Sequence, residues 1–142
     1  GELYGKLESG EAILRVEGSF YQYLREDFFS VPGAVYAVWE ENGQYISALR
    51  LEPYQDGLLL EALETHPSFR QKGYAARLIR SVIDHLRQQG QTVIYSHVAK
   101  RNKASLCTHK SCGFFQVSDW AEYIDGSITQ RSCTMKYIIK PE

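Results

Sequence analysis

One segment of this sequence limits the fold more than any other, because its apolar residues repeat with the period of an α-helix. These residues are Ala75, Leu78, Ile79, Val82, Ile83 and Leu86. Spacings of three and four residues place all of them on one helix face, and Gly90 follows as a C-terminal cap. That face needs a second layer to cover it, and segments of β character stand before and after it in the chain.

The segments before this helix predict an antiparallel series of strands. Residues 34–40 and 44–51 are β-rich and are separated by Glu41-Asn42-Gly43, and Asn-Gly is the strongest short-range hairpin signal. A third strand runs from Gly57 to Thr65 and is closed by Pro67.

The segments after the helix alternate in type. We predict strands over residues 92–98, 114–117 and 133–139, with Asp125-Gly126 as a hairpin turn before the last. Asn102 caps a shorter helix that reaches about Cys112, and Gly113 ends it. The pattern predicts an α+β or α/β domain with a mixed sheet.

The N-terminal part is predicted to hold a short strand and a helix. Residues 11–17 form the strand. Ser19 opens the helix, because Phe20, Leu24 and Phe28 recur every four residues and Gln22 completes a capping box. The helix ends before Pro32.

Length and charge narrow the class of protein. The chain has 142 residues, which fits a single domain over residues 1–142. It carries 16 Lys and Arg against 17 Asp and Glu, and this balance argues against a nucleic-acid or membrane-surface partner. No apolar run reaches the roughly 18 residues of a transmembrane helix.

The cysteines and the first residues of the chain indicate its cellular location, its processing and whether it binds a metal. Three cysteines at irregular spacing imply no disulfide framework, so we expect a cytoplasmic protein. The sequence begins Gly-Glu-Leu-Tyr, without a signal peptide or an initiator Met, so we expect a processed or trimmed chain. Cys107, His109 and Cys112 are close in sequence, but helical geometry points the first two apart, and we expect no metal site.

The junction before the central helix carries the clearest chemical signal. Arg70, Lys72 and Gly73 lie where a strand gives way to a helix. The free N–H groups of a first helical turn, the helix dipole and these cations together predict an anion site. The alternatives are an ordinary solvated turn, or a nucleotide-phosphate module that prefers ATP.

Two motifs together resemble the GNAT superfamily of N-acetyltransferases. Leu63 to Pro67 followed by Arg70-Gln71-Lys72-Gly73-Tyr74-Ala75 is similar to the family's acetyl-CoA signature, Arg/Gln-x-x-Gly-x-Gly/Ala. Asn102, Ser105 and Gly113-Phe114 are similar to its second signature. The resemblance covers about residues 19–139 and leaves residues 1–18 poorly matched. It implies a three-layer α+β fold: a mixed, mostly antiparallel central sheet with a splayed strand pair, flanked by helices.

The resemblance also implies a cosubstrate site for acetyl-CoA. The end of the splayed strand would bind the pantetheine arm, and the loop would bind the pyrophosphate. Asn102 and Ser105 would lie near the distal pantetheine or the adenine. The implied cofactor-binding residues are Leu63, Glu64, Thr65, Arg70, Gln71, Lys72, Gly73, Tyr74, Ala75, Asn102 and Ser105.

Two catalytic roles follow from the same resemblance. Glu61 and Glu64 lie on the strand before the loop, on opposite faces by the period of two, and Glu61 shares its face with Leu63 and Thr65. Glu61 is the expected base, with a peripheral salt-bridging carboxylate as the alternative. His109 stands where relatives have the Tyr that protonates the thiolate, so His109 is the expected acid. The alternatives are a surface histidine with water or another residue such as Tyr137 as donor.

The expected reaction is acetyl transfer from acetyl-CoA to an amine of a small molecule or peptide, by direct attack in a ternary complex. The acceptor pocket would use the early aromatic residues and the acidic, aromatic segment 119–125, which suit a cationic amine. We expect a monomer or homodimer. The alternative is a noncatalytic acyl-CoA-binding or regulatory domain of the same fold, because the usual Tyr is missing.

Overall fold

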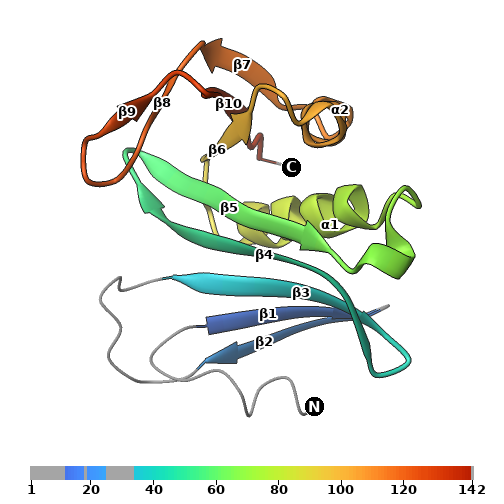
Figure 1. The fold of residues 1–142 in the computed structure, drawn as a ribbon. Coiled ribbons are helices and arrows are strands. Elements are labelled where there is room, and N and C mark those ends of the chain that lie inside the picture. Colours follow the sequence, from blue (N-terminus) through green and yellow to red (C-terminus); the bar gives the residue numbers. More distant parts are fainter. Residues whose placement is uncertain (1–11, 18, 25–33, 142) are drawn as a thin grey trace.

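The computed structural model describes residues 12–17, 19–24 and 34–141 (Figure 1). The strands are β1 (Ala12–Glu17), β2 (Ser19–Leu24), β3 (Val35–Glu41), β4 (Gln44–Tyr54), β5 (Gly57–Thr65), β6 (Val93–Ala99), β7 (Phe115–Ser118), β8 (Ala121–Glu122), β9 (Ile128–Thr129) and β10 (Ser132–Ile138). The helices are the short 3₁₀ helix η2 (Pro67–Phe69), α1 (Tyr74–Gln88) and α2 (Lys103–Ser111). No helix in these ranges is both long enough and apolar enough to cross a bilayer.

The main sheet is mixed and mostly antiparallel, as predicted. Its described strands run in the order β2-β1-β3-β4-β5-β6-β10-β7, and β8 pairs with β9 in a separate hairpin. Two neighbouring pairs are parallel, β1 with β3 and β5 with β6. The predicted hairpin between β3 and β4 is confirmed, with Asn42 and Gly43 both at positive φ, as a type I′ turn requires.

The predicted helix from Ser19 is wrong over the residues described. Ser19–Leu24 is strand β2, paired antiparallel with β1 from Glu17↔Ser19 to Ala12↔Leu24. Its aromatic residues favour a strand, and pairing with β1 satisfies backbone groups that a short isolated helix would satisfy poorly. The rest of the predicted helix, including Phe28, lies outside the described residues. The predicted strand over residues 11–17 is confirmed over its described part, Ala12–Glu17, which forms β1.

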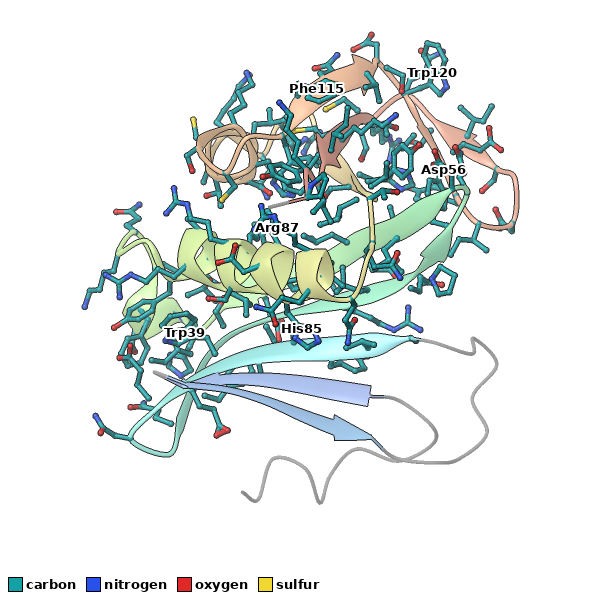
Figure 2. The ribbon with its side chains drawn as sticks, turned by 180° about the vertical axis from the view of Figure 1, so that it is seen from behind. Trp39, Asp56, His85, Arg87, Phe115 and Trp120 are labelled. Atoms are coloured by element: carbon teal, nitrogen blue, oxygen red, sulfur yellow. The ribbon has the colours of Figure 1, made fainter. Side chains whose placement is uncertain are left out.

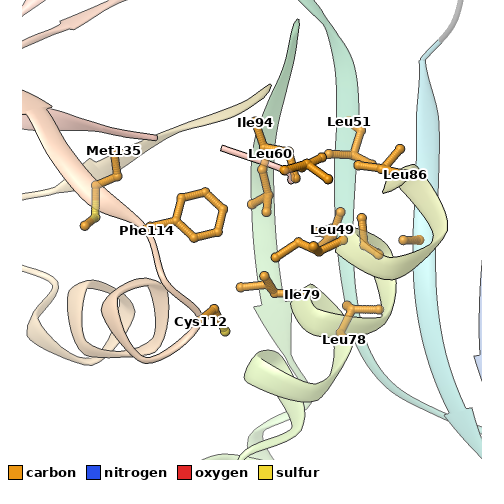
Figure 3. Close-up of a cluster of buried hydrophobic side chains, with 14 of the residues drawn as sticks. Leu49, Leu51, Leu60, Leu78, Ile79, Leu86, Ile94, Cys112, Phe114 and Met135 are labelled. Atoms are coloured by element: carbon orange, nitrogen blue, oxygen red, sulfur yellow. The ribbon is translucent and has the colours of Figure 1, made fainter. Parts of the chain in front are cut away.

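The central helix packs as its periodicity indicates. Its buried residues are Leu78, Ile79, Val82, Ile83 and Leu86. Figure 3 shows Leu78, Ile79 and Leu86 facing buried side chains of the sheet, among them Leu49, Leu51, Leu60 and Ile94. Cys112, at the end of α2, joins the same cluster. Both helices therefore lie on one face of the sheet, which we call the helix face.

Aromatic contacts fix the N-terminal end of α1 against the sheet. Trp39 of β3 packs on Tyr74 with ring centroids 6.4 Å apart, and Tyr74 packs on Phe69 at 5.7 Å. The Tyr74 hydroxyl also donates to Glu41 Oε1 at 3.1 Å. Figure 2 shows Trp39 at this end of α1 and His85 toward the other end. The loop between β5 and α1 thus rests on packed rings.

Candidate active site

The sheet opens between β5 and β6. The two parallel strands pair only through Leu58↔Ile94, Leu59↔Tyr95 and Leu60↔Ser96, and beyond this last pair they separate (Figure 1). The opening holds a cleft of about 200 Å³, here called the wedge cleft. Its lining residues are Leu60, Glu61, Ala62, Leu63, Ser96, His97, Val98, Ala99, Asn102, Ser105 and His109. The splayed strand pair that the resemblance implied is therefore present.

A second, larger cleft of about 540 Å³ adjoins the first and is here called the loop cleft. It is lined by Leu63, Glu64, Thr65, Phe69, Arg70, Gln71, Gly73, Tyr74, Ala75, Ala76, Asn102, Ala104, Ser105 and Thr108. Leu63, Asn102 and Ser105 line both clefts. The structure thus brings together along this groove all the predicted cofactor residues except Lys72.

The loop before α1 is shaped to admit an anion. Gly73 precedes the helix at φ +83°, and a Cβ built on it would meet nothing within 4 Å. The first N–H groups of α1 have no partner within the helix and carry the positive end of its dipole. Arg70 Nε donates to the Thr65 carbonyl at 3.1 Å, which ties the cation to the strand end. These features fit a pyrophosphate group. Lys72 instead lies over the Phe69 ring at 5.8 Å.

Asn102 and Ser105 form the opposite wall of the groove. Asn102 Oδ1 accepts from the Ser105 backbone N–H at 3.0 Å, so the predicted N-cap of α2 is confirmed. Because both residues line both clefts, the start of α2 faces the strand end Leu63–Thr65 across the groove.

A bulge changes which way the carboxylates of β5 point. Arg50 lies opposite Glu61 and Ala48 opposite Glu64, so β5 carries one extra residue over this stretch, and Ala62 has φ +54°. The extra residue reverses the alternation of side chains. Glu61 and Glu64 therefore share the face opposite the helix face. The predictions that they point to opposite faces, and that Glu61 shares its face with Leu63 and Thr65, are wrong.

Glu61 lies in an ion pair at the edge of the wedge cleft. Arg50 Nη1 donates to Glu61 Oε1 at 2.6 Å and also bonds Glu52. The Glu61 side chain remains 32% exposed. Glu61 therefore contacts solvent, lines the wedge cleft and is held in one orientation by Arg50.

His109 is buried, so the surface alternative is wrong. It is 1% exposed, its Nε2 lies 2.8 Å from Ser96 Oγ and its Nδ1 lies 2.8 Å from the Ser105 carbonyl oxygen. The ring packs on Phe114 at 5.1 Å. Burial lowers the pKa of His109, opposed by the hydrogen bond to Ser105.

The alternative proton donor and the cysteines considered as metal ligands do not line the wedge cleft. Tyr137 packs on Phe114 at 5.5 Å and is absent from the lining of either cleft. Cys107 is exposed, and Cys112 Sγ faces the Ala76 carbonyl. Among the described residues no group of three potential metal ligands is assembled.

Part of the predicted acceptor region packs against a residue that lines the wedge cleft. Tyr123 of the segment 119–125 packs on His97 at 5.7 Å, and Tyr54 packs on the same ring at 5.4 Å. His97 lines the cleft, and burial lowers its pKa. Trp120 is exposed, and Asp119 pairs with Lys100 at 3.1 Å. Phe28 and Phe29 lie outside the described residues.

Sequence reasoning missed two residues of the site. Ser96 bonds the His109 ring, and Arg50 holds Glu61. A serine in a strand and an arginine in another carry no local signal. Each acquires its place through contacts between segments distant in the chain.

Comparisons with known proteins agree with this geometry. The model of the acetyltransferase (GNAT) family matches residues 6–114, while no curated protein matches by sequence. The fold is similar to the ribosomal-protein-S18-alanine N-acetyltransferase of Escherichia coli, with a TM-score of 0.58, 20% identity and coverage of 72% of this chain and 67% of that one. It is similar to Tetrahymena GCN5 at a TM-score of 0.61, 19% identity and coverage of 75% and 69%.

A third solved structure is the spermidine N-acetyltransferase of Vibrio cholerae in complex with CoA and spermine. Its TM-score is 0.56, with 21% identity and coverage of 68% of this chain and 59% of that one. The family model covers most of the sequence, including the loop before α1 and the whole of α2. The chain therefore belongs to the GNAT family of acetyltransferases.

Proposed function

We propose that this protein transfers the acetyl group of acetyl-CoA to an amine of a small molecule or peptide, by direct attack in a ternary complex. The observation that carries the proposal is the groove: the loop cleft, with its anion-binding features, adjoins a wedge cleft that ends among titratable side chains. A ligand with a phosphate end and a long polar arm matches that shape.

Different residues of the groove would bind different parts of this cosubstrate. The loop from Arg70 to Ala75 would hold the pyrophosphate through backbone N–H groups. Among the residues that the structure describes, no strand pairs with the edge of β5 at Leu63–Thr65 on the β6 side, so its backbone can bond the amides of the pantetheine arm. Asn102 and Ser105 would close the groove from α2. Bound acetyl-CoA supplies an activated acyl group and a thiolate leaving group.

Two side chains are proposed to move protons. An amine arrives as an ammonium and must lose a proton, whereas the departing thiolate must gain one. Glu61 is partly exposed and faces away from the helices, where a cationic acceptor can reach it. His109 lies deeper in the same cleft. We assign Glu61 the role of base and His109 the role of proton donor.

The acceptor is proposed to be a cationic amine bound beside His97 and Tyr123. Aromatic faces attract such cations, and two solved structures of similar fold are named for acetylation of spermidine and of a ribosomal-protein alanine, which supports an amine acceptor here. The three free thiols are consistent with a cytoplasmic location.

One observation favours the noncatalytic alternative. Both ring nitrogens of His109 already form hydrogen bonds, so neither is available to a substrate as the ring stands. The discriminating experiment has two steps. Thermal shifts with CoA, acetyl-CoA, ATP and NAD identify the ligand, and CoA release is then followed with a panel of amines. Stabilisation by acetyl-CoA without release for any amine would support the binding domain, and no stabilisation at millimolar acetyl-CoA would exclude both functions.

A further inference from the structure

Ser96 and His109 form a buried hydrogen-bonded pair at the inner end of the wedge cleft. Ser96 is 2% exposed and His109 is 1% exposed, and both line the cleft. Ser96 Oγ lies 2.8 Å from His109 Nε2. Ser96 also belongs to the last pair of β5 with β6, so the pair stands where the two strands begin to separate.

The neighbours of the ring determine which nitrogen carries its proton. His109 Nδ1 lies 2.8 Å from the Ser105 carbonyl oxygen, which can only accept a hydrogen bond, so Nδ1 is the protonated nitrogen of the neutral ring. Nε2 then holds a lone pair, and the Ser96 hydroxyl donates to it. Burial lowers the pKa of His109, which favours this neutral form near pH 7.

His109 therefore cannot reach a substrate by itself. One ring nitrogen is held by a backbone carbonyl and the other by Ser96, and the Phe114 ring packs against the imidazole at 5.1 Å. A direct proton transfer between the ring and a substrate would need the hydrogen bond of the transferring nitrogen to break. Ser105 Oγ lies farther from the ring, 3.4 Å from Nδ1, so the Ser96 hydroxyl, 2.8 Å from Nε2, is the group through which the imidazole exchanges a proton with the cleft.

We propose that Ser96 and His109 act as a proton relay, in which the Ser96 hydroxyl touches the reacting atoms and His109 stores the proton. This inference rests on the proposed acetyl transfer. It adds Ser96 as a catalytic residue and makes His109 first an acceptor and then a donor.

The protons and bonds balance as follows. An ammonium loses two protons on becoming an amide nitrogen, and Glu61 takes the first and releases it to the solvent that its side chain contacts. As the nitrogen bonds to the acyl carbon, Ser96 Oγ accepts the second proton and passes its own to His109 Nε2. When the carbon–sulfur bond breaks, its electron pair leaves with sulfur. His109 returns the proton to Ser96 Oγ, and Ser96 donates its hydroxyl proton to the thiolate. Both residues end in their starting states.

The pair can be tested without any activity measurement. In ¹⁵N NMR spectra of protein labelled at histidine, we expect His109 near pH 7 as the neutral tautomer with its proton on Nδ1. In Ser96→Ala, the Nε2 resonance should move, because its lone pair loses a donor. A ring protonated on Nε2, or no change in the Ser96→Ala spectrum, would overturn the relay even if the protein is an active acetyltransferase.

The kinetic test compares matched serine variants. Ser96→Ala should lower kcat by about 10²–10⁴-fold, while the CoA dissociation constant stays within about twofold of wild type. Ser96→Thr keeps the hydroxyl and should recover most of kcat. Ser111→Ala is the control, because it removes an exposed hydroxyl of α2 that donates to the Thr108 carbonyl and lines neither cleft. A kcat within about twofold of wild type for Ser96→Ala would contradict the proposal.

Two further measurements use the wild-type protein and need no variant. The single-turnover rate of acetyl transfer, plotted against the fraction of heavy water in the solvent, should follow a curve, because two protons move together in the relay. A straight line would overturn the relay. Mass spectrometry after incubation with acetyl-CoA alone should find Ser96 unmodified, and an acetylated Ser96 would make it a nucleophile instead. If wild-type protein acetylates no amine, the proposed function fails, whereas the NMR result still decides whether the pair exists.

Discussion

Glu61 and Arg50 lie opposite each other on β5 and β4, with the carboxylate Oε1 2.6 Å from the guanidinium Nη1. The same guanidinium bonds Glu52, which is 5% exposed. Arg50 thus joins a buried carboxylate to one that reaches the cleft. This arrangement allows the salt bridge and the proposed base to be separated by experiment, because each carboxylate can be neutralised alone.

Glu61→Gln should lower the acetylation rate by about 10²–10⁴-fold, because the amide keeps the shape but cannot accept the ammonium proton. A higher pH should partly restore the rate, since a neutral amine needs no base. The measurement is a pH series of kcat/KM with one amine. Glu52→Gln is the control: it weakens the same cluster but leaves Glu61, so its rate should stay within about twofold of wild type. Equal losses in the two variants would assign Glu61 a structural role.

His109→Phe should slow turnover while leaving CoA affinity nearly intact, because the ring stores a proton and does not line the loop cleft. His109→Tyr places the residue usual in relatives at this position and should recover more activity than His109→Phe. Steady-state kinetics and CoA thermal shifts on both variants provide the comparison. Turnover within about twofold of wild type for His109→Phe would remove the ring from catalysis.

One buried and two partly buried histidines should make the fold less stable in mild acid. Burial lowers the pKa of His85, His97 and His109 in the folded protein, so the unfolded chain binds more protons below its pKa of about 6.5. Their contribution to stability is complete above that pH and is lost as the pH falls toward the folded pKa values. We expect the melting temperature to fall between pH 7 and pH 5, and less steeply in His109→Tyr. An equally steep fall in that variant would contradict the role given to His109.

Gly73→Glu should abolish stabilisation by CoA, because it places an anion where the pyrophosphate would bind. In the wild type, acetyl-CoA at a hundred times its dissociation constant should add about 2.7 kcal/mol to the free energy of unfolding. Gly90→Glu is a matched control at the other end of α1: its φ is +80°, and a Cβ there also meets nothing within 4 Å. Both variants carry similar backbone strain, so a CoA shift retained in Gly73→Glu would exclude the loop as the phosphate site.

Local signals predicted most of the fold. The helix periodicity over residues 75–86 appears as α1, and the Asn42-Gly43 turn joins β3 to β4. The segment Gly57–Thr65 is a strand with the bounds that the sequence indicated. These elements are determined by neighbours in the chain, which is why the sequence alone suffices for them.

The sequence-based predictions were wrong where contacts between residues distant in the chain determine the structure. Phe20 and Leu24 lie four residues apart, as on a helix face, yet pairing with β1 makes Ser19–Leu24 a strand. The bulge at Ala62 depends on the register with β4, and it reversed the expected directions of the β5 side chains. The burial of His109 depends on Ser96 and Phe114, which no spacing in α2 reveals.

The short pairing of β5 with β6 makes the two halves of the sheet mechanically distinct. Three residue pairs join β5 to β6, whereas seven join β6 to β10. A ligand lying in the wedge would bond to strand edges that pair with no other described strand, and would thereby link the two halves of the sheet. Amide hydrogen exchange along Ala62–Thr65 should slow when CoA is present, so the cosubstrate would contribute to the cohesion of the sheet as well as to its chemistry.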